Sequence, residues 1–228
     1  MIGKANTISH VIIVIRIITG ESRNKKHPEL IYHVKDNLLP CELDAQGVWD
    51  MMKAHAPMKN NVIRIEISPA KEHTKDFTMQ DWQQLWDDFV REYDKIEMAD
   101  DDGKVYSHKT NLADSTYTGR PHLEPDSRTP HLPAAVCRKD RNGRTNNDHK
   151  IHIRAHDAAQ EVAIKRGWIT AMEIHKTNAV KVAKDLMDIL RTMPSWSWDD
   201  YAARIQAKGY TLKERKDDKG VIKGYTIG

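Results

Sequence analysis

TMQDWQQLWDDFVREYDKI, residues 78–96, is the stretch of this sequence that decides the fold. Thr78 and Asp81 match a capping box, in which two side chains satisfy the first free backbone amides of a helix. Apolar side chains then recur in steps of three and four residues, the spacing of one helix face. They are Trp82, Leu85, Trp86, Phe89, Val90, Tyr93 and Ile96. The stretch predicts an amphipathic helix covering a sheet or another helix, and we interpret its tryptophans as core residues rather than a base-stacking platform.

Two segments before this helix are predicted strands. Residues 9–19, SHVIIVIRIIT, are β-branched and almost continuously apolar, which favours a strand buried on both faces. Residues 61–68, NVIRIEIS, alternate, so that Arg64 and Glu66 lie on the polar side of a second strand. A short helix is expected between them over residues 44–54.

The segments after the helix complete an α+β order. We expect strands at 115–122 and 132–139, helices at about 151–167, 170–194 and 197–209, and a hairpin that turns at 218–220. This order predicts a central, largely antiparallel sheet with helices packed against it, plus C-terminal helices and a β-hairpin. We assign residues 1–168 to the core and expect residues 169–228 to pack on the same domain.

The composition describes a chain with one substantial core and a hydrated surface. It has 228 residues, of which 39% are hydrophobic and 30% are charged. The longest apolar run, residues 11–18, contains Arg16 and is far shorter than the roughly 20 residues of a membrane span. It also lacks a secretion cleavage signal. The distant Cys41 and Cys137 indicate buried thiols in a reducing compartment, so we expect a cytoplasmic protein without a membrane segment.

The charge pattern permits a nucleic-acid partner without requiring one. The formal net charge is only +3, which excludes a polycation. Basic residues cluster at 23–26, 165–166 and 213–223, and acidic residues concentrate around 87–102. Such asymmetry fits a phosphate-binding face, and it equally fits a solvated surface.

Two histidines lie on either side of the loop that joins two predicted strands. His122 ends one strand and His131 begins the next, so an antiparallel pair would bring both imidazoles to one side of the sheet. Divalent metals that polarise phosphate need converging nitrogen or oxygen ligands, and Glu124 or Asp126 in the loop could add an oxygen. With twelve histidines in the chain, chance proximity remains an alternative interpretation.

These motifs resemble those of the HUH relaxases, the mobilisation nucleases of plasmids and conjugative elements. The shared pattern is a strand ending in His-x-Glu, a loop, and a strand starting Thr-Pro-His-hydrophobic-His. Four longer blocks are similar to those of mobilisation proteins from Bacteroides-type mobilisable elements, and they cover almost the whole chain. The blocks are residues 8–39, 62–94, 129–155 and 195–227.

The resemblance implies an activity and partners. Such enzymes nick one DNA strand at a transfer origin by metal-assisted transesterification, become joined to its 5′ phosphate and later reseal it. The expected ligands are Mn²⁺ or Mg²⁺ and single-stranded or hairpin DNA, with accessory mobilisation proteins as further partners. The resemblance also suggests a monomer, here the nuclease domain without its usual helical or helicase-like extension.

The resemblance also assigns roles to individual residues. Those matched to metal ligands are His122, His131 and Glu124. Those matched to catalysis are Glu66 as a carboxylate, His10 or Tyr32 as the nucleophile and Arg16 near the phosphate. Those expected to contact DNA are Arg23, Lys25, Lys26 and Arg138. Tyr32 as a packing residue and Glu66 as a surface carboxylate in an ion pair are the plainer interpretations.

Two positions depart from the relaxase pattern. Pro133 stands where a third metal-binding histidine is expected, and proline offers neither a side-chain donor atom nor a backbone N–H. Ile17 stands where many relaxases have a nucleophilic tyrosine. The sequence therefore leaves open an active relaxase and a catalytically impaired protein that binds origin DNA. A hydrolase of small phosphorylated substrates and a scaffold explain fewer of the motifs.

Overall fold

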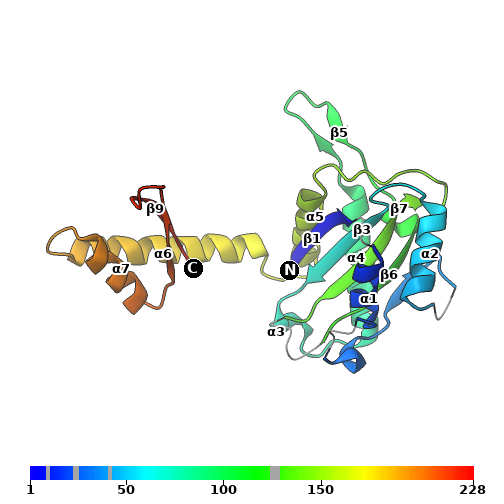
Figure 1. Cartoon of the computed structure of the whole chain (residues 1–228), viewed down its shortest axis with the longest axis horizontal. Coiled ribbons are helices and arrows are strands. Elements are labelled where there is room, and N and C mark those ends of the chain that lie inside the picture. The colour runs from blue at the N-terminus through cyan, green and yellow to red at the C-terminus, as the bar shows by residue number, and fades with distance from the viewer. Residues whose placement is uncertain (9–10, 23–25, 41–42, 124–128) are drawn as a thin grey trace. The chain divides into compact units, whose positions relative to one another are not determined.

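The computed structural model describes residues 1–8, 11–22, 26–40, 43–123 and 129–228. It divides into two compact units, Met1–Ala171 and Met172–Gly228. The α+β prediction is confirmed, with a five-stranded antiparallel sheet, helices against it, and C-terminal helices with a β-hairpin (Figure 1).

The first unit is organised around the five-stranded sheet. Its strand order is β1-β3-β7-β6-β2, and every neighbouring pair is antiparallel. The strands are β1 (Ile2–Ile8), β2 (Lys35–Asn37), β3 (Val62–Ser68), β6 (Ser115–Gly119) and β7 (Leu132–Asp140). The predicted strands at 61–68, 115–122 and 132–139 are thus confirmed, and β7 lies at the centre of the sheet.

Two helices cover one side of this sheet, which we call the closed face. They are α4 (Met79–Lys95) and α5 (Ile151–Lys165). The strand residues beneath them are Ile63, Ile65, Ile67, Leu132, Ala134 and Val136, all fully buried. As predicted, α4 begins with a capping box between Thr78 and Asp81, and Trp82 and Trp86 belong to the core. The closed face therefore holds the main hydrophobic core.

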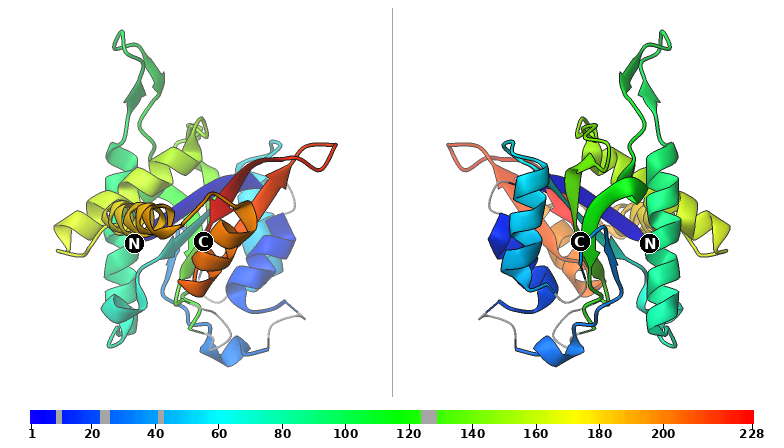
Figure 2. Two further views of the ribbon diagram at one scale, coloured as in Figure 1. Left: turned by 90° about the vertical axis from the view of Figure 1, so that its left-hand side faces the viewer. Right: turned by 90° about the vertical axis from the view of Figure 1, so that its right-hand side faces the viewer.

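Two other helices cover only part of the opposite side, which we call the half-open face. Helices α1 (Val11–Thr19) and α2 (Ala45–His55) pack over Val62, Ala135 and Cys137. Figure 2 shows the layers, with α1 and α2 on one side of the sheet and α4 on the other. Lys4 and Asn6 of β1 are exposed on this face. The predicted buried thiol is confirmed for Cys137, whose pKa is raised by burial, and Cys41 lies outside the described residues.

One prediction is wrong: the apolar run within residues 9–19 forms helix α1 rather than a strand. Val11, Ile15 and Ile18 lie on one helix face and are buried in the core with α2, while Ile13 and Arg16 point outward. The N-terminal strand is instead β1. Its buried positions are Gly3 and Ala5, since α5 passes so close that a Cβ atom on Gly3 would lie 2.2 Å from the Ala155 carbonyl oxygen.

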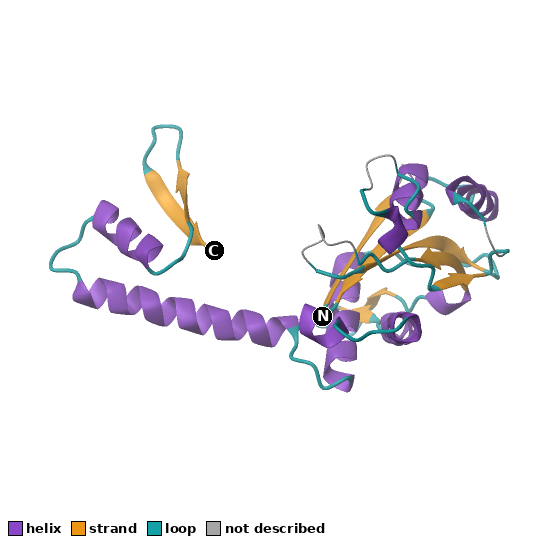
Figure 3. Cartoon of the chain, turned by 90° about the horizontal axis from the view of Figure 1, so that it is seen from below, coloured by secondary structure: helices purple, strands orange, loops and turns teal. Residues whose placement is uncertain are grey.

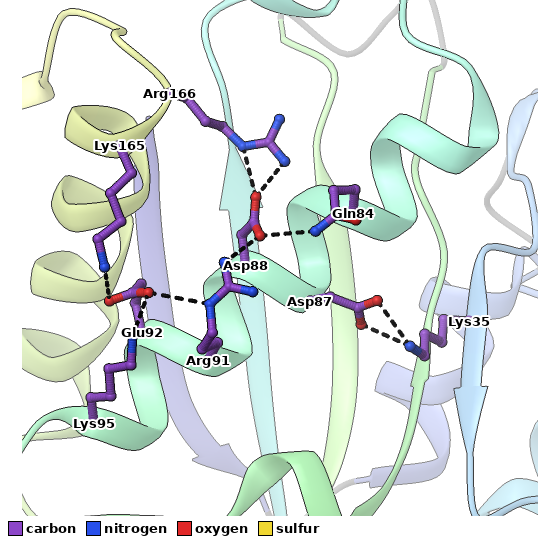
Figure 4. Close-up of polar contacts among 9 residues, drawn as sticks. All are labelled: Lys35, Gln84, Asp87, Asp88, Arg91, Glu92, Lys95, Lys165 and Arg166. Atoms are coloured by element: carbon purple, nitrogen blue, oxygen red, sulfur yellow. Dashed lines mark hydrogen bonds and ion pairs between the residues drawn. The ribbon is translucent and has the colours of Figure 1, made fainter.

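Ion pairs join the elements of the closed face. Glu92 of α4 receives hydrogen bonds from Lys165 at 2.6 Å and Lys95 at 3.0 Å, and Asp88 binds Arg166 at 2.6 Å (Figure 4). Lys35 of the edge strand β2 binds Asp87 at 2.8 Å. These contacts hold α5 and β2 to the outer surface of α4.

The remaining short elements of the first unit connect the layers. They are η1 (Pro28–Leu30), α3 (Lys71–Thr74), β4 (Met98–Ala99), β5 (Val105–Ser107) and η2 (Leu112–Asp114). Strands β4 and β5 form a separate ribbon that extends beyond the sheet (Figure 1).

The second unit has its own small core. It consists of α6 (Ala171–Thr192, from Met172 onward), α7 (Trp198–Ala207) and the hairpin β8 (Leu212–Lys216) to β9 (Ile222–Ile227) (Figure 3). Ile189, Tyr201 and Ile205 form its buried centre. Its eleven Lys and Arg against eight Asp and Glu give a net charge of +3, while the first unit carries 25 of each. None of the helices in the described residues has the length and apolarity to cross a bilayer.

Candidate functional site

The structure brings His122 and His131 together. The two residues form an antiparallel bridge, with the His122 amide donating to the His131 carbonyl at 2.8 Å and the reverse bond at 3.3 Å. Their ring centroids are 5.0 Å apart, and the ring planes make an angle of 69°. Cross-strand partners share a face of the sheet, so both imidazoles lie on the half-open face.

Backbone carbonyls orient both rings. His122 is 1% exposed, and its Nε2 lies 3.0 Å from the Ile18 carbonyl oxygen at the end of α1. The Nδ1 of His131 lies 3.2 Å from the Thr129 carbonyl oxygen. Because a carbonyl only accepts, these nitrogens carry the protons, and in a neutral ring the opposite nitrogen is the one able to bind a metal. Metal-binding histidines are commonly oriented in this way.

Glu66 lies on the same face as the histidines. Residues 131 and 133 of one strand point the same way, and Pro133 is the register partner of Glu66 on β3. The Glu66 carboxylate, whose side chain is 24% exposed, receives a hydrogen bond from Arg64 at 2.9 Å. Two histidines, a proline and an ion-paired carboxylate therefore occupy neighbouring positions on the half-open face.

The described residues do not complete a metal site. Among them, no group of three or more His, Cys, Asp and Glu side chains is placed to hold a metal ion. Pro133 supplies no donor atom at the expected third position. Glu124, the third ligand predicted by the resemblance, lies outside the described residues, as does Asp126. Within the described residues, the two imidazoles are the candidate nitrogen donors of this site.

The predicted catalytic residues are not all brought to the histidines. Arg16 points outward from α1, and Ile17 is partly buried on the same helix. Tyr32 is 37% exposed, and its amide donates to the Pro121 carbonyl at 3.2 Å. Ile31, not Tyr32, is the bridge partner of His122. His10 lies outside the described residues.

The predicted DNA contacts are also divided. Arg23 and Lys25 lie outside the described residues, and Lys26 is exposed. The Arg138 side chain is only 12% exposed, donates to the Asn60 carbonyl at 3.2 Å and pairs with Asp148 at 3.0 Å. Arg138 therefore holds β7 to neighbouring loops in this structure.

A polar pocket on the half-open face was missed by the sequence analysis. Its volume is about 240 Å³, and it is lined by Lys4, Asn6, Arg64 and Glu66. Lys4 faces Glu66 and Asn6 faces Arg64 across the β1–β3 ladder. The pocket was missed because β1 was not predicted. In β1, polar residues alternate with Gly and Ala, and the large apolar residues that indicate a strand are lacking. A larger cavity of about 670 Å³ at the end of α2 contains none of the candidate residues.

Arg120 was missed as well, although it lies two residues before His122. Its amide donates to the Pro133 carbonyl at 3.2 Å, which continues the β6–β7 ladder beyond Gly119 and Ala134. Its side chain therefore lies on the half-open face beside the histidines. The spacing Arg-x-His within a predicted strand was the available signal.

Comparison with models of known protein families gives no match, and comparison with curated protein sequences gives none either. The resemblance to relaxases therefore stays a prediction.

Proposed function

We propose that this chain is a relaxase-type domain that binds single-stranded or hairpin DNA at the transfer origin of a plasmid or mobilisable element and nicks one strand. The observation that carries the proposal is the pairing of His122 and His131, with ring centroids 5.0 Å apart, on the face that also presents Glu66. The resemblance of the four sequence blocks points to the same class of protein.

The open part of this face supports a nucleic-acid ligand. Lys4, Asn6 and Arg64 line a polar pocket on β1 and β3 beside Glu66, and Lys4 and Asn6 are exposed. Cationic and amide side chains on a groove contact the sugar–phosphate backbone, which is independent of sequence. A single strand crossing β1 and β3 would reach the histidines at the ends of β6 and β7.

The reaction is a transesterification. A nucleophile attacks the scissile phosphorus, a protein–phosphate bond forms, and the bond to the 3′ oxygen breaks as that oxygen takes up a proton. His10 and Tyr32 remain the candidate nucleophiles. An imidazole held by a backbone carbonyl can accept or donate the proton, which is the role we give to His131. The described residues do not supply a complete set of ligands for Mn²⁺ or Mg²⁺, so binding of the ion would also require Glu124.

The test is nicking of supercoiled plasmid carrying the protein's own transfer origin, with Mn²⁺ present and denaturing gels to detect protein-linked DNA. We expect His131→Ala to lower the nicking rate by about 100-fold or more, in line with the loss of a general acid–base. His108→Ala is the matched control, because His108 is an exposed histidine near Glu97 whose backbone carbonyl binds Arg154 of α5 on the closed face. Absence of any protein-linked nicked strand with wild-type protein would reject the nuclease.

A second candidate is a protein that binds origin DNA without cutting it. Pro133 and the two-donor set of described ligands favour it. This candidate predicts DNA binding that weakens steeply with salt and does not change with EDTA. Pro133→His and Ile17→Tyr, singly and together, should then raise Mn²⁺ affinity and nicking. Cleavage by the wild-type protein that depends on His131 would reject this candidate.

A further inference from the structure

Arg120 belongs to a row of side chains that crosses four strands of the half-open face. Lys4 on β1 pairs with Glu66 on β3, Glu66 pairs with Pro133 on β7, and Pro133 accepts from the Arg120 amide. His122 follows two residues after Arg120 and forms the next pair of the ladder with His131. Arg120 therefore lies beside both Pro133 and the histidine pair.

The charge of Arg120 is poorly compensated within the described residues. Its side chain is 18% exposed, and the only carboxylate within ion-pair distance is Asp36, at 3.9 Å. That carboxylate is closer to His33, at 3.0 Å. Burial lowers the pKa of Arg120, although Asp36 and Glu21 oppose the shift. Guanidinium remains charged all the same, so the fold carries a largely buried cation at a cost to stability.

Other buried arginines of this unit are better satisfied. Arg154 is fully buried and donates to the Ser107 hydroxyl at 2.7 Å and to the carbonyls of His108 and Ile96. Arg138 binds the Asn60 carbonyl and Asp148. Both leave Nε without a partner, as Arg120 does, but Arg120 forms no side-chain hydrogen bond with any described residue. A buried polar group left in this state calls for an explanation.

We infer that Arg120 binds a phosphate of the DNA strand beside His122 and His131, and so supplies positive charge where Pro133 leaves the metal ligands incomplete. This inference rests on the proposed function. Guanidinium presents a planar fork that matches two oxygens of a phosphate, and such charge-assisted pairs are strong in partly buried sites. The phosphate would replace the hydrogen bonds that the protein does not provide.

The experiment measures thermal unfolding and the affinity for a labelled single-stranded oligonucleotide of mixed sequence over a range of salt concentrations. Arg120→Met should unfold at an unchanged or higher temperature, because it removes a poorly paired buried charge. Its DNA affinity should fall about 10- to 100-fold, the usual effect of losing a charged hydrogen bond. The slope of log affinity against log salt should decrease in magnitude by about 0.7, the value for one phosphate contact on single-stranded DNA.

Two further variants sharpen the result. Arg120→Lys keeps the charge without the fork, so it should retain the salt slope and lose part of the affinity. Arg91→Gln is the matched control, since Arg91 is an ion-paired arginine on α4, outside the half-open face, and should leave DNA affinity unchanged.

The outcomes separate this inference from the proposed function. If Arg120→Met binds DNA with unchanged affinity and salt slope, the inference is overturned and the relaxase proposal stands. If the wild-type protein binds no single-stranded DNA, both are overturned. If Arg120→Met and Arg120→Lys both unfold at much lower temperature, Arg120 has a structural role and the inference is overturned as well.

Discussion

Residues of the closed face and residues of the half-open face alternate along the same strands, but their side chains are buried to different extents. On β3, Ile63, Ile65 and Ile67 are fully buried beneath α4 and α5. Between them, the side chains of Arg64 and Glu66 on the other face are 37% and 24% exposed. Because α1 and α2 cover only part of that face, the same strands that build the core also present charged groups to solvent. The difference locates the candidate site.

Two charged groups, Asp94 at the end of α4 and Arg120 on the half-open face, differ in how well the fold satisfies them. Asp94, at the end of α4, receives hydrogen bonds from Thr110 and from the amides of Leu112 and Ala113. Burial nevertheless raises the pKa of Asp94. Arg120 on the half-open face has no comparable set of partners among the described residues. Asp94 is thus satisfied within the fold, whereas the Arg120 guanidinium is available to a ligand.

The largest expected effect is on the closed face. Phe89→Ala removes a fully buried ring packed between Trp86 and Tyr93, so it should lower the free energy of unfolding by about 3–5 kcal/mol. Asn6→Ala, an exposed position of the half-open face, should change it by no more than about 0.5 kcal/mol. Urea unfolding followed by tryptophan fluorescence measures both. Similar losses at the two positions would abolish the distinction between the faces.

Gly3→Ala tests how closely α5 packs on the closed face. The added methyl would lie 2.2 Å from the Ala155 carbonyl oxygen and 2.9 Å from Ala159 Cβ, so β1 and α5 must separate. We expect a loss of about 1–3 kcal/mol in the free energy of unfolding.

The matched control for this glycine is Gly47→Ala in α2. There the nearest atom, Leu43 Cδ2, is 3.1 Å from the new methyl and belongs to a flexible side chain. The gain in helix propensity of about 0.5–1 kcal/mol should offset this mild crowding. A large loss at Gly47, or none at Gly3, would contradict the close packing of β1 against α5.

His122→Ala should have a smaller effect on stability. It removes the buried ring that binds the Ile18 carbonyl at the end of α1, and an unsatisfied buried acceptor costs about 1–2 kcal/mol. His131→Ala should cost less, because the partly buried His131 binds a carbonyl of its own loop. Chemical unfolding of both variants measures the difference. A larger loss for His131 would contradict the stabilising role of the hydrogen bond between His122 and the Ile18 carbonyl.

The sequence predicted most of the fold because most elements have strong local signals. The capping box and apolar stripe of α4 and the alternation of β3 are of this kind. Residues 11–18 misled us because a short run of Ile and Val fits a strand and a buried helix equally well. Packing against α2 selects the helix, since Val11, Ile15 and Ile18 fall on one side at helical spacing. Only tertiary contacts decide such a case.

The candidate site was predictable only in part for a related reason. His122 and His131 could be placed together because a single short loop joins their strands. The position of Lys4 could not be predicted, because the buried positions of β1 are Gly3 and Ala5. These residues are small because α5 packs closely against them, and they do not indicate a strand. The poor pairing of Arg120 depends on Asp36 and His33 from another strand and loop, so it is visible only in three dimensions.

The smallest expected effect concerns the ion pairs that hold α5 to α4. Burial would raise the pKa of Asp88 and Glu92, but hydrogen bonds from Arg166 and Lys165, among others, outweigh burial and lower it. A carboxylate with a lowered pKa stabilises the fold above its unfolded pKa, about 3.9 for Asp and 4.3 for Glu. It loses this contribution as the pH falls through the folded pKa.

The double variant Arg166→Gln and Lys165→Gln should therefore have a lower free energy of unfolding at pH 7, by less than about 1 kcal/mol per ion pair. The difference from wild type should shrink toward about pH 2. Urea unfolding at a series of pH values measures this, with Lys71→Gln as the control, because Lys71 forms no ion pair with the described residues. A difference that stays constant with pH would show that the two cations stabilise the α4–α5 contact through their apolar stems and not through Asp88 and Glu92.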